Sequence, residues 1–281
     1  MISIAMSRGV LARVVGVVVL VAVGFGAPAA RAQTATPPGL AEYAVLGVAG
    51  VRIGRESRVV SGAVGSVAGT VRLGPKARVS SVVAGPTVRL GLAAHTGMLF
   101  CHLVSGPPTL PTCDAFTDPL VEPALLAPVP IAPGSTDLRI PAHTGTAPTP
   151  PGTFRDVRVG AGGLLQLYGG VYAARSLRIG HGARVVCVSD CRIGVEGRVR
   201  LGRGAELGSV SPIRADTARV DVAWSGPGAA FIARPRANLI ATIFAPAGDV
   251  IVGRLGAYRG ALVGHTVVVG PSVTIRGDSA L

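Results

Sequence analysis

Arginine residues at regular intervals are the main chemical feature of this chain. They stand in a pattern of apolar residue, Arg, apolar residue, Gly, two variable positions, a small residue, any residue and an apolar residue. Neighbouring copies begin roughly 20 residues apart, which is the length of one turn of a repeat protein. Guanidinium groups bind carboxylates and phosphates through paired hydrogen bonds, so a regular series of them suits an anionic polymer. The arginines of the pattern are Arg52, Arg72, Arg89, Arg158, Arg178 and Arg200.

The pattern predicts short strands. An alternation of apolar, Arg and apolar residues has a period of two, so the arginine points to the opposite face of the strand from its apolar neighbours. The glycine is expected to end the strand at a sharp turn, often with φ above zero. Such a short strand cannot bury its apolar face alone, whereas stacked copies form continuous interior columns. We therefore predict an all-β fold, a single-stranded parallel β-helix (β-solenoid).

Other fold classes fit the composition less well. The 40 glycines, the 22 prolines and the many valines disfavour helices. A sandwich or barrel built from hairpins is the alternative, but Asn-Gly and Asp-Gly turns are nearly absent and the repeat length is too regular. A small residue at the seventh position, such as Ala77, Ala183 or Ala205, suits a narrow interior corner.

The repeat divides the chain into segments. Residues 101–153 are rich in proline, which central strands exclude, so they are predicted to leave the solenoid and pack along its side. The last strand-rich block, 237–281, is expected to close the stack. The predicted segments are a signal peptide at 1–32, a flexible segment leading into the solenoid at 33–42, N-terminal coils at 43–100, the Pro-rich excursion at 101–153, and C-terminal coils with a cap at 154–281.

The first 32 residues resemble a secretory signal. Arg8 and Arg13 precede an apolar stretch at 14–26, and Ala30-Arg31-Ala32 fits the small residues of a cleavage site. The alternative is an uncleaved membrane anchor, but the apolar stretch is short for a membrane span, so cleavage is favoured. No second apolar segment of spanning length follows, so no transmembrane segment is expected after cleavage. The protein is therefore predicted to be exported, to the periplasm, the cell surface or the extracellular space.

Four cysteines in an exported chain predict two disulfides. Three pairings are possible, and we favour the local one, Cys101–Cys113 and Cys187–Cys191, because each pair brackets a short turn-like segment. A metal site is disfavoured, since the second pair has no partner pair or histidine at zinc spacing. The histidines, expected at surface turns, are His95, His102, His143, His181 and His265. No cofactor is expected.

Stacking in register would place the first three pattern arginines about 4.8 Å apart on an outward face, and the last three in a second group. Two unit charges at that distance repel by about 0.9 kcal/mol in water. Such a row is unfavourable unless carboxylates or an anionic polymer lie beside it. An acidic polysaccharide, lipopolysaccharide phosphate or extracellular DNA would serve, although no aromatic residues interleave with the arginines to favour nucleic acid. The alternative is a solvated face that prevents sheet-to-sheet association.

Carboxylates are the residues to consider for an enzyme, because a glycosidase needs two facing acidic groups. Asp216 and Asp221 are five apart, which puts them on opposite faces of one strand. The acidic residues of the Pro-rich excursion are expected in a solvated loop, and those beside arginines are expected to be charge partners. The first group is Asp114, Asp118 and Glu122, and the second is Asp156, Glu196 and Glu206. The enzymatic alternative is an acidic-polysaccharide lyase with Arg178 as base, or a hydrolase.

The C-terminal half resembles a known family. Residues 241–253 (ATIFAPAGDVIVG) and 256–270 (GAYRGALVGHTVVVG), with Asp278 and Leu281 after them, are similar to the end of a bacterial exported β-helix domain of poorly known function. Residues 151–160 (PGTFRDVRVG) and 167–172 (LYGGVY) resemble an upstream coil of the same group. The short coils resemble the polymer-forming bactofilins more distantly. The resemblance covers 150–281 and implies a β-helical surface or secreted module, with no catalytic residues to carry over.

We therefore predict a secreted or envelope-associated structural or adhesive module. The pattern arginines are its candidate ligand-binding residues for an acidic polysaccharide or another anionic polymer. Exposed terminal coils of a solenoid are unpaired strand edges, so self-association end to end is a further expectation.

Overall fold

The computed structural model describes residues 39–108, 111–114, 120–210 and 217–278. The predicted signal peptide, and most of the segment predicted to follow it, lie outside these residues. The described chain contains 26 strands, the two short 3-10 helices η1 (Leu40–Glu42) and η2 (Pro123–Leu126), and no α-helix. Its parallel strands stack as a β-solenoid of about 11 turns, which confirms the predicted fold class.

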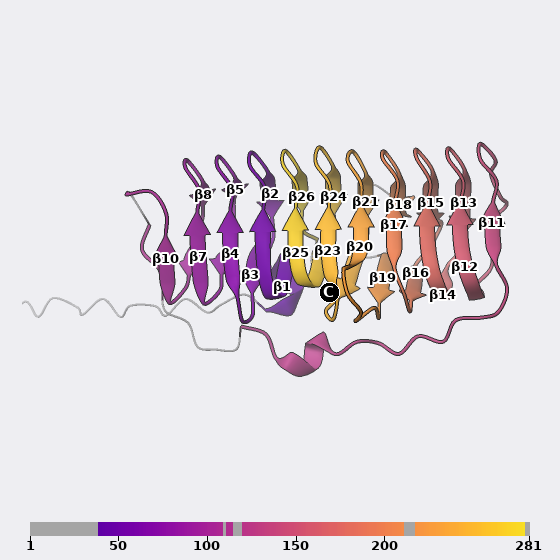
Figure 1. The fold of residues 1–281 in the computed structure, drawn as a ribbon, viewed down its shortest axis with the longest axis horizontal. Coiled ribbons are helices and arrows are strands. Elements are labelled where there is room, and N and C mark those ends of the chain that lie inside the picture. Colours follow the sequence, from indigo (N-terminus) through magenta and orange to yellow (C-terminus); the bar gives the residue numbers. More distant parts are fainter. Residues whose placement is uncertain (1–38, 109–110, 115–119, 211–216, 279–281) are drawn as a thin grey trace, which may run out of the picture. The chain divides into compact units, whose positions relative to one another are not determined.

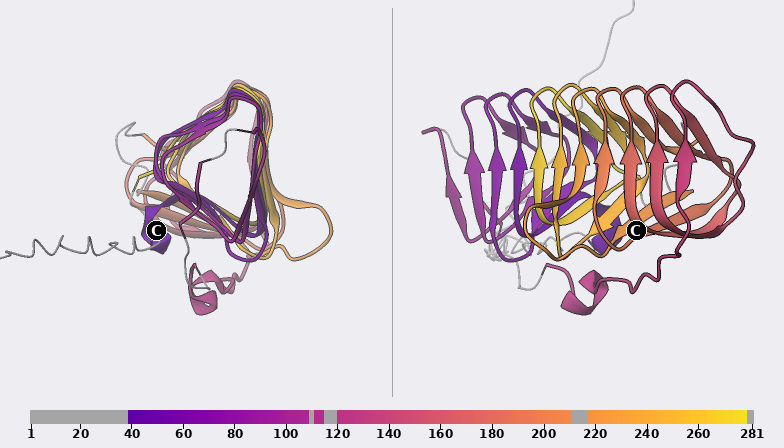
Figure 2. Two further views of the ribbon diagram at one scale, coloured as in Figure 1. Left: turned by 90° about the vertical axis from the view of Figure 1, so that its left-hand side faces the viewer. Right: turned by 45° about the vertical axis from the view of Figure 1, so that its right-hand side comes forward.

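Each coil surrounds one apolar interior with three walls, which gives the triangular outline in Figure 2. A 17-stranded sheet forms two walls and a 9-stranded sheet forms the third. The pattern's apolar residues point inward, as the alternation predicts: Val71, Leu73 and Val79 are buried in one coil. The small residue at the seventh position is also buried, because it fills the corner; Ala77 and Ala183 have no exposed surface.

The strands of the arginine wall and of the nine-stranded wall follow in the order in which they stack. The arginine wall consists of β11 (Leu138–Ile140), β12 (Gly152–Val159), β14 (Gly170–Ile179), β17 (Val199–Leu201), β20 (Ala229–Ala233), β23 (Asp249–Val252), β25 (Leu262–Val269), β1 (Tyr43–Ile53), β4 (Thr70–Leu73), β7 (Thr87–Leu90) and β10 (Leu103–Ser105). The nine-stranded wall consists of β13 (Leu164–Leu167), β15 (Arg184–Cys187), β18 (Glu206–Ser209), β21 (Asn238–Ile240), β24 (Ala257–Arg259), β26 (Thr274–Arg276), β2 (Arg58–Ser61), β5 (Arg78–Val79) and β8 (His95–Thr96). The third wall contains the first parts of β12, β14, β25 and β1 with β16 (Cys191–Val195), β19 (Ala218–Val222), β22 (Thr242–Ala245), β3 (Ala63–Ser66), β6 (Val83–Ala84) and β9 (Leu99–Phe100).

The chain enters the stack in its middle (Figure 1). From β1 it winds to one end at β10, crosses to the opposite end at β11, and winds back until β25 pairs with β1 and β26 with β2. The block at 237–281, expected to close the stack, therefore lies in its centre, and that expectation was wrong. The repeat specifies that coils stack, but not which coil is the neighbour of which. The two ends of the stack are the coils of β10 and β11.

The described residues of the crossing segment, 106–108, 111–114 and 120–137, are called the strap. It is shorter than the predicted excursion at 101–153, because β10 and β11 already belong to the arginine wall. Pro141 replaces the pattern's glycine after β11, and this hid the coil in the sequence. The strap runs along the outside of the stack (Figures 1 and 2), and three of its residues are buried against the third wall. They are Leu120, Val121 and Leu126, and they pack in a cluster with Tyr43, Leu46, Phe100, Phe244 and Val263.

Both predicted disulfides form. Cys101 and Cys113 join the last N-terminal coil to the beginning of the strap, with 5.4 Å between their Cα atoms. Cys187 and Cys191 join β15 to β16 within one coil, with 6.0 Å between their Cα atoms. Among the described residues, no helix has the length and apolar character needed to span a bilayer.

The glycines of the pattern form a column along the stack. Glycine is required there for a different reason from the one predicted. None of them has a positive φ; the positive φ falls two residues later, as at Glu56 and Lys76. Glycine is required because neighbouring coils approach closely there. A Cβ atom on Gly74 would lie 2.7 Å from the backbone nitrogen of Arg55, and one on Gly180 would lie 2.7 Å from that of Ala161. The column is therefore a line of close backbone contact between coils.

Candidate functional site

The pattern arginines lie in one column on the outside of the arginine wall. Three of them pair in register in the N-terminal part of the stack, and the others in the C-terminal part. All are exposed, because the alternation turns them away from the interior. The N-terminal ladder is Arg52, Arg72 and Arg89, and the C-terminal ladder is Arg139, Arg158, Arg178 and Arg200.

Arg139 is a ladder residue that the sequence reasoning missed. It pairs in register with Arg158 and is exposed like the others. Its flanking residues Leu138 and Ile140 have the apolar–Arg–apolar alternation, but Pro141 follows in place of glycine. The alternation alone was the signal that would have identified it.

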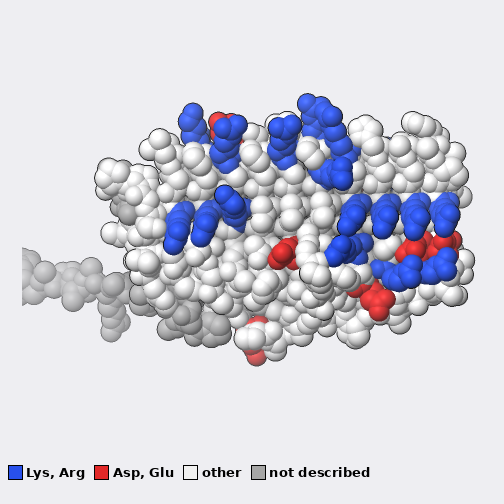
Figure 3. Space-filling model, viewed as in Figure 1, with Lys and Arg blue, Asp and Glu red and all other residues white. Residues whose placement is uncertain are grey.

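Three apolar residues separate the two ladders. Arg200 pairs with Ile232, then the column continues through Ile251 and Val268 to Arg52. In Figure 3 the column is one line of basic side chains across the middle of this face, interrupted by an uncharged interval; further basic side chains lie above and below it. The basic column therefore consists of two separate segments.

A trough runs beside each ladder. The arginine side chains form one side of the trough. The glycine column has no side chains, so the bottom of the trough is backbone. The hollow beside the N-terminal ladder measures about 540 Å³ and includes Gly54, Gly74 and Gly91. The hollow beside the C-terminal ladder measures about 550 Å³ and reaches Arg234, which replaces a glycine of the column. Each trough is open and elongated along the stack, a form suited to an extended chain.

Carboxylates accompany the C-terminal ladder at one end. Asp156 is 5% exposed and lies 2.7 Å from Arg175 Nη2 and 3.6 Å from Arg158 Nη2. Hydrogen bonds from Arg175 and from Ser176 hold the pKa of Asp156 below its usual range. A neighbouring carboxylate, Asp137, accepts hydrogen bonds from two arginines, and the bond from Arg155 is the main cause of its lowered pKa. Part of the positive charge of this ladder is therefore compensated within the chain.

The N-terminal ladder lacks such compensation from the described residues. Within the described part of the chain, none of its three arginines has a carboxylate within ion-pair distance. The adjacent nine-stranded wall adds charge of the same sign, since Arg58 and Arg78 pair in register there. This end of the stack therefore carries uncompensated like charges on two walls.

The acidic residues and histidines considered in the sequence analysis lie outside the two ladders. Glu206 binds Arg184 at 2.6 Å and Asp156 binds arginines, as expected of charge partners. The same expectation was wrong for Glu196, whose exposed carboxylate forms no ion pair with a described residue. Asp221 is 2% exposed and lies between Arg192 and Arg219. Asp118 and Asp216 lie outside the described residues. The prediction that Asp216 and Asp221 lie on opposite faces of one strand therefore stays a prediction. All five histidines are exposed, and within the described ranges no group of three or more His, Cys, Asp or Glu residues could hold a metal ion.

The fold and this column define a β-solenoid with two in-register arginine ladders. Comparison with protein-family models, with curated proteins and with solved structures found no match. The resemblance of residues 150–281 to an exported β-helix domain therefore remains a prediction from the sequence.

Proposed function

We propose that this β-solenoid is an exported structural or adhesive module that binds a linear acidic polymer along its arginine ladders. The observation that carries the proposal is the register of seven outward arginines in two segments of one column. Like charges repel at this spacing, so the arrangement is favourable with an anion beside it. The two disulfides support an oxidising compartment outside the cytoplasm.

The form of the troughs favours an extended chain over a small anion. Successive arginines of a ladder repeat at the strand spacing of about 4.8 Å, and the trough floor continues past each of them. A polysaccharide with one carboxylate or sulfate on successive sugars can place an anion beside successive guanidinium groups. Each such contact is a charge-assisted hydrogen bond with bidentate geometry available.

Nucleic acid is the less favoured polyanion. Binding of single strands uses aromatic side chains on which bases stack, interleaved with basic residues. In the described chain the aromatic ring nearest a guanidinium is that of Trp224, 4.5 Å from Arg198, which belongs to neither ladder. The ladders themselves alternate with apolar residues that face the interior. The surface therefore offers charge without stacking platforms.

The test is retention of the mature protein on heparin, a sulfated acidic polysaccharide. We expect retention that survives physiological salt and is lost when Arg52, Arg72 and Arg89 are replaced by Gln. A control variant with Arg203, Arg254 and Arg276 replaced by Gln loses the same charge from exposed positions outside the ladders, and it should stay bound. Absence of retention by the wild type at low salt would contradict the proposal. An equal loss of retention in both variants would show that the ladder arginines contribute no more than other exposed arginines.

A further inference from the structure

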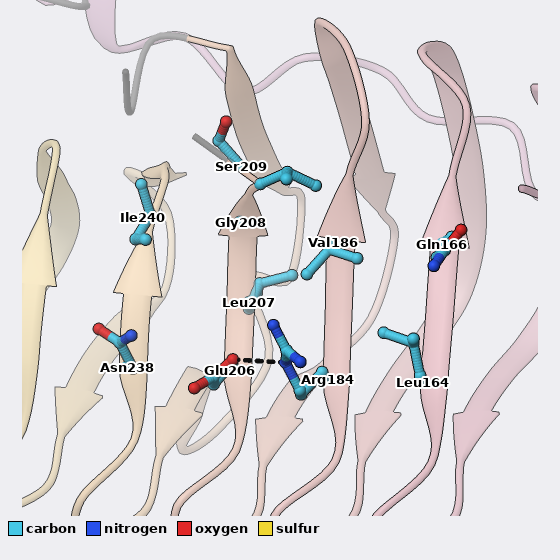
Figure 4. Close-up of a pocket in the computed structure, with 11 residues that line it drawn as sticks. Leu164, Gln166, Arg184, Val186, Glu206, Leu207, Gly208, Ser209, Asn238 and Ile240 are labelled. Atoms are coloured by element: carbon cyan, nitrogen blue, oxygen red, sulfur yellow. Dashed lines mark hydrogen bonds and ion pairs between the residues drawn. The ribbon is translucent and has the colours of Figure 1, made fainter. Parts of the chain in front are cut away.

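A third hollow, separate from the two troughs, lies on the nine-stranded wall and contains no ladder residue. It measures about 240 Å³ and opens over β13, β15, β18 and β21 (Figure 4). Gly208 creates it, because this outward position of β18 has no side chain between those of Val186 and Ile240 on the neighbouring strands. Only glycine fits: φ is 141°, and a Cβ atom would lie 2.0 Å from the carbonyl oxygen of Ile240.

Polar side chains line the rim of this hollow. Arg184, Glu206 and Asn238 stand in one row across three strands, with the Arg184 Nε donating to Glu206 Oε2 at 2.6 Å. Gln166 lies across the hollow on β13 (Figure 4). The side-chain amides of Gln166 and Asn238 are half-buried and form no hydrogen bond with any described residue. They are therefore available to a ligand.

The chemistry of the hollow differs from that of the ladders. Its one cation and one anion are paired with each other, so it carries no net charge to attract an anion. Val186 and Ile240 give it apolar sides, while two amides, a carboxylate and a guanidinium offer donors and acceptors at the rim. Its volume is below the roughly 300–1,000 Å³ of pockets that enclose drug-sized ligands, so it suits a single ring.

We infer that this hollow binds one neutral sugar residue. A pyranose ring has an apolar C–H face, which would lie against Val186 and Ile240. Its hydroxyls both donate and accept hydrogen bonds, as the carboxylate of Glu206 and the amide of Asn238 require. The inference does not depend on the proposed polyanion binding, because the two surfaces share no residue.

The test uses saturation-transfer NMR of the mature protein with millimolar mixtures of neutral methyl glycosides (glucoside, galactoside, mannoside and N-acetylglucosaminide). We expect transfer to the ring protons of at least one glycoside. Asn238→Ala and Glu206→Gln should each weaken that binding roughly tenfold, the effect of losing one good hydrogen bond. Thr274→Ala is the matched control, since Thr274 is half-buried on the same wall two strands beyond Asn238 in the same row.

Each outcome decides the inference. Transfer that is lost in the two hollow variants and kept in Thr274→Ala supports it. No transfer to any glycoside, or transfer that persists in both hollow variants, overturns it. The Arg52/Arg72/Arg89→Gln variant should keep the sugar signal while it loses heparin, which separates failure of this site from failure of the proposed function.

Discussion

The two arginine ladders share one column and one register, but they differ in what lies beside them. The C-terminal ladder ends next to Asp137 and Asp156, which bind arginines at 2.7 Å. The N-terminal ladder has no carboxylate partner in the described chain, and two further arginines pair in register on the adjacent wall. One region is thus partly neutralised by its own residues and the other is not. The proposed polyanion would therefore relieve the most repulsion at the N-terminal ladder.

Ladder spacing is a consequence of backbone packing and not of the arginines themselves. Like charges do not bring strands together; the apolar interior and the hydrogen bonds between coils do. The distance between the arginines is therefore set by the stacking of the coils. Because the arginines are exposed to water and salt, the repulsion is at most about 1 kcal/mol for each neighbouring pair. The buried interior and the bonds between coils can therefore hold together a charged row that is unfavourable by itself.

The largest expected effect comes from breaking the stack under either ladder. Gly180→Ala places a Cβ atom 2.7 Å from the backbone of the next coil, and Gly74→Ala does the same under the N-terminal ladder. We expect each to lower the free energy of unfolding by roughly 2–3 kcal/mol. Gly182→Ala is the control in the same turn: its Cβ atom meets nothing, although φ of 58° costs about 1 kcal/mol. Urea denaturation distinguishes them, and equal losses would contradict the account of the column.

The next largest effect is expected at Asp156, the buried carboxylate that distinguishes the C-terminal ladder from the N-terminal one. Asp156→Asn removes the carboxylate that binds Arg175 and Ser176 in a buried position. We expect a loss of about 1–2 kcal/mol in the free energy of unfolding, because a charged hydrogen-bond network is broken. Glu196→Gln, which changes an exposed carboxylate without a partner in the described chain, is the control and should change little. Equal effects in the two variants would show that Asp156 contributes nothing special.

The same carboxylate predicts a pH dependence. Because hydrogen bonds from Arg175 and Ser176 lower the pKa of Asp156 in the folded state, its contribution is present above the unfolded value of about 3.9. It is lost as the pH falls through the folded-state pKa. The stability difference between wild type and Asp156→Asn should therefore be constant near neutrality and shrink below pH about 4. A difference that grows in acid would contradict this sign.

The sequence predicts that short strands stack into a β-solenoid, but it does not predict which coils are neighbours. Alternation around each arginine is local, so the strands and their outward residues could be predicted from short segments. The pairing of β25 with β1 joins residues more than 200 positions apart, and no local pattern specifies it. The hollow at Gly208 was not predictable for the same reason, since it depends on which residues of β15 and β21 face that glycine. Arg139 was missed because Pro141 replaces the glycine.

Removing a central ladder charge should affect the two ladders differently. Arg72 stands between Arg52 and Arg89, so Arg72→Gln relieves two repulsions of about 0.9 kcal/mol each and should raise stability by at most about 2 kcal/mol at low salt. Arg158→Gln also removes a contact with Asp156 at 3.6 Å, so it should bring no gain. Thermal unfolding at low and high salt measures both. A gain for Arg72→Gln that persists at high salt would not be electrostatic.

The smallest effect is expected from changing how the two ladder regions are joined. Gly277 lies against Ala44, so a short linker can join Asp278 to Leu40 in a chain opened between Ala127 and Pro128. This permutant has its coils in the order of the stack. We expect its stability to lie within about 1 kcal/mol of the wild type, because only loop closure changes. A permutant that fails to form the disulfide-linked β-sheet fold would show that the strap connection is essential.

The most direct test is the salt dependence of binding to a defined heparin fragment, measured by titration calorimetry. Wild type is compared with two variants in which Arg52, Arg72 and Arg89, or Arg158, Arg178 and Arg200, are replaced by Gln. Each lost ion contact should reduce the slope of log affinity against log salt by roughly 0.7–0.9. The account predicts a lower slope in both variants, with the larger loss of slope and affinity in the first. Slopes equal to the wild type in both variants would contradict a polyanion-binding role for the ladders.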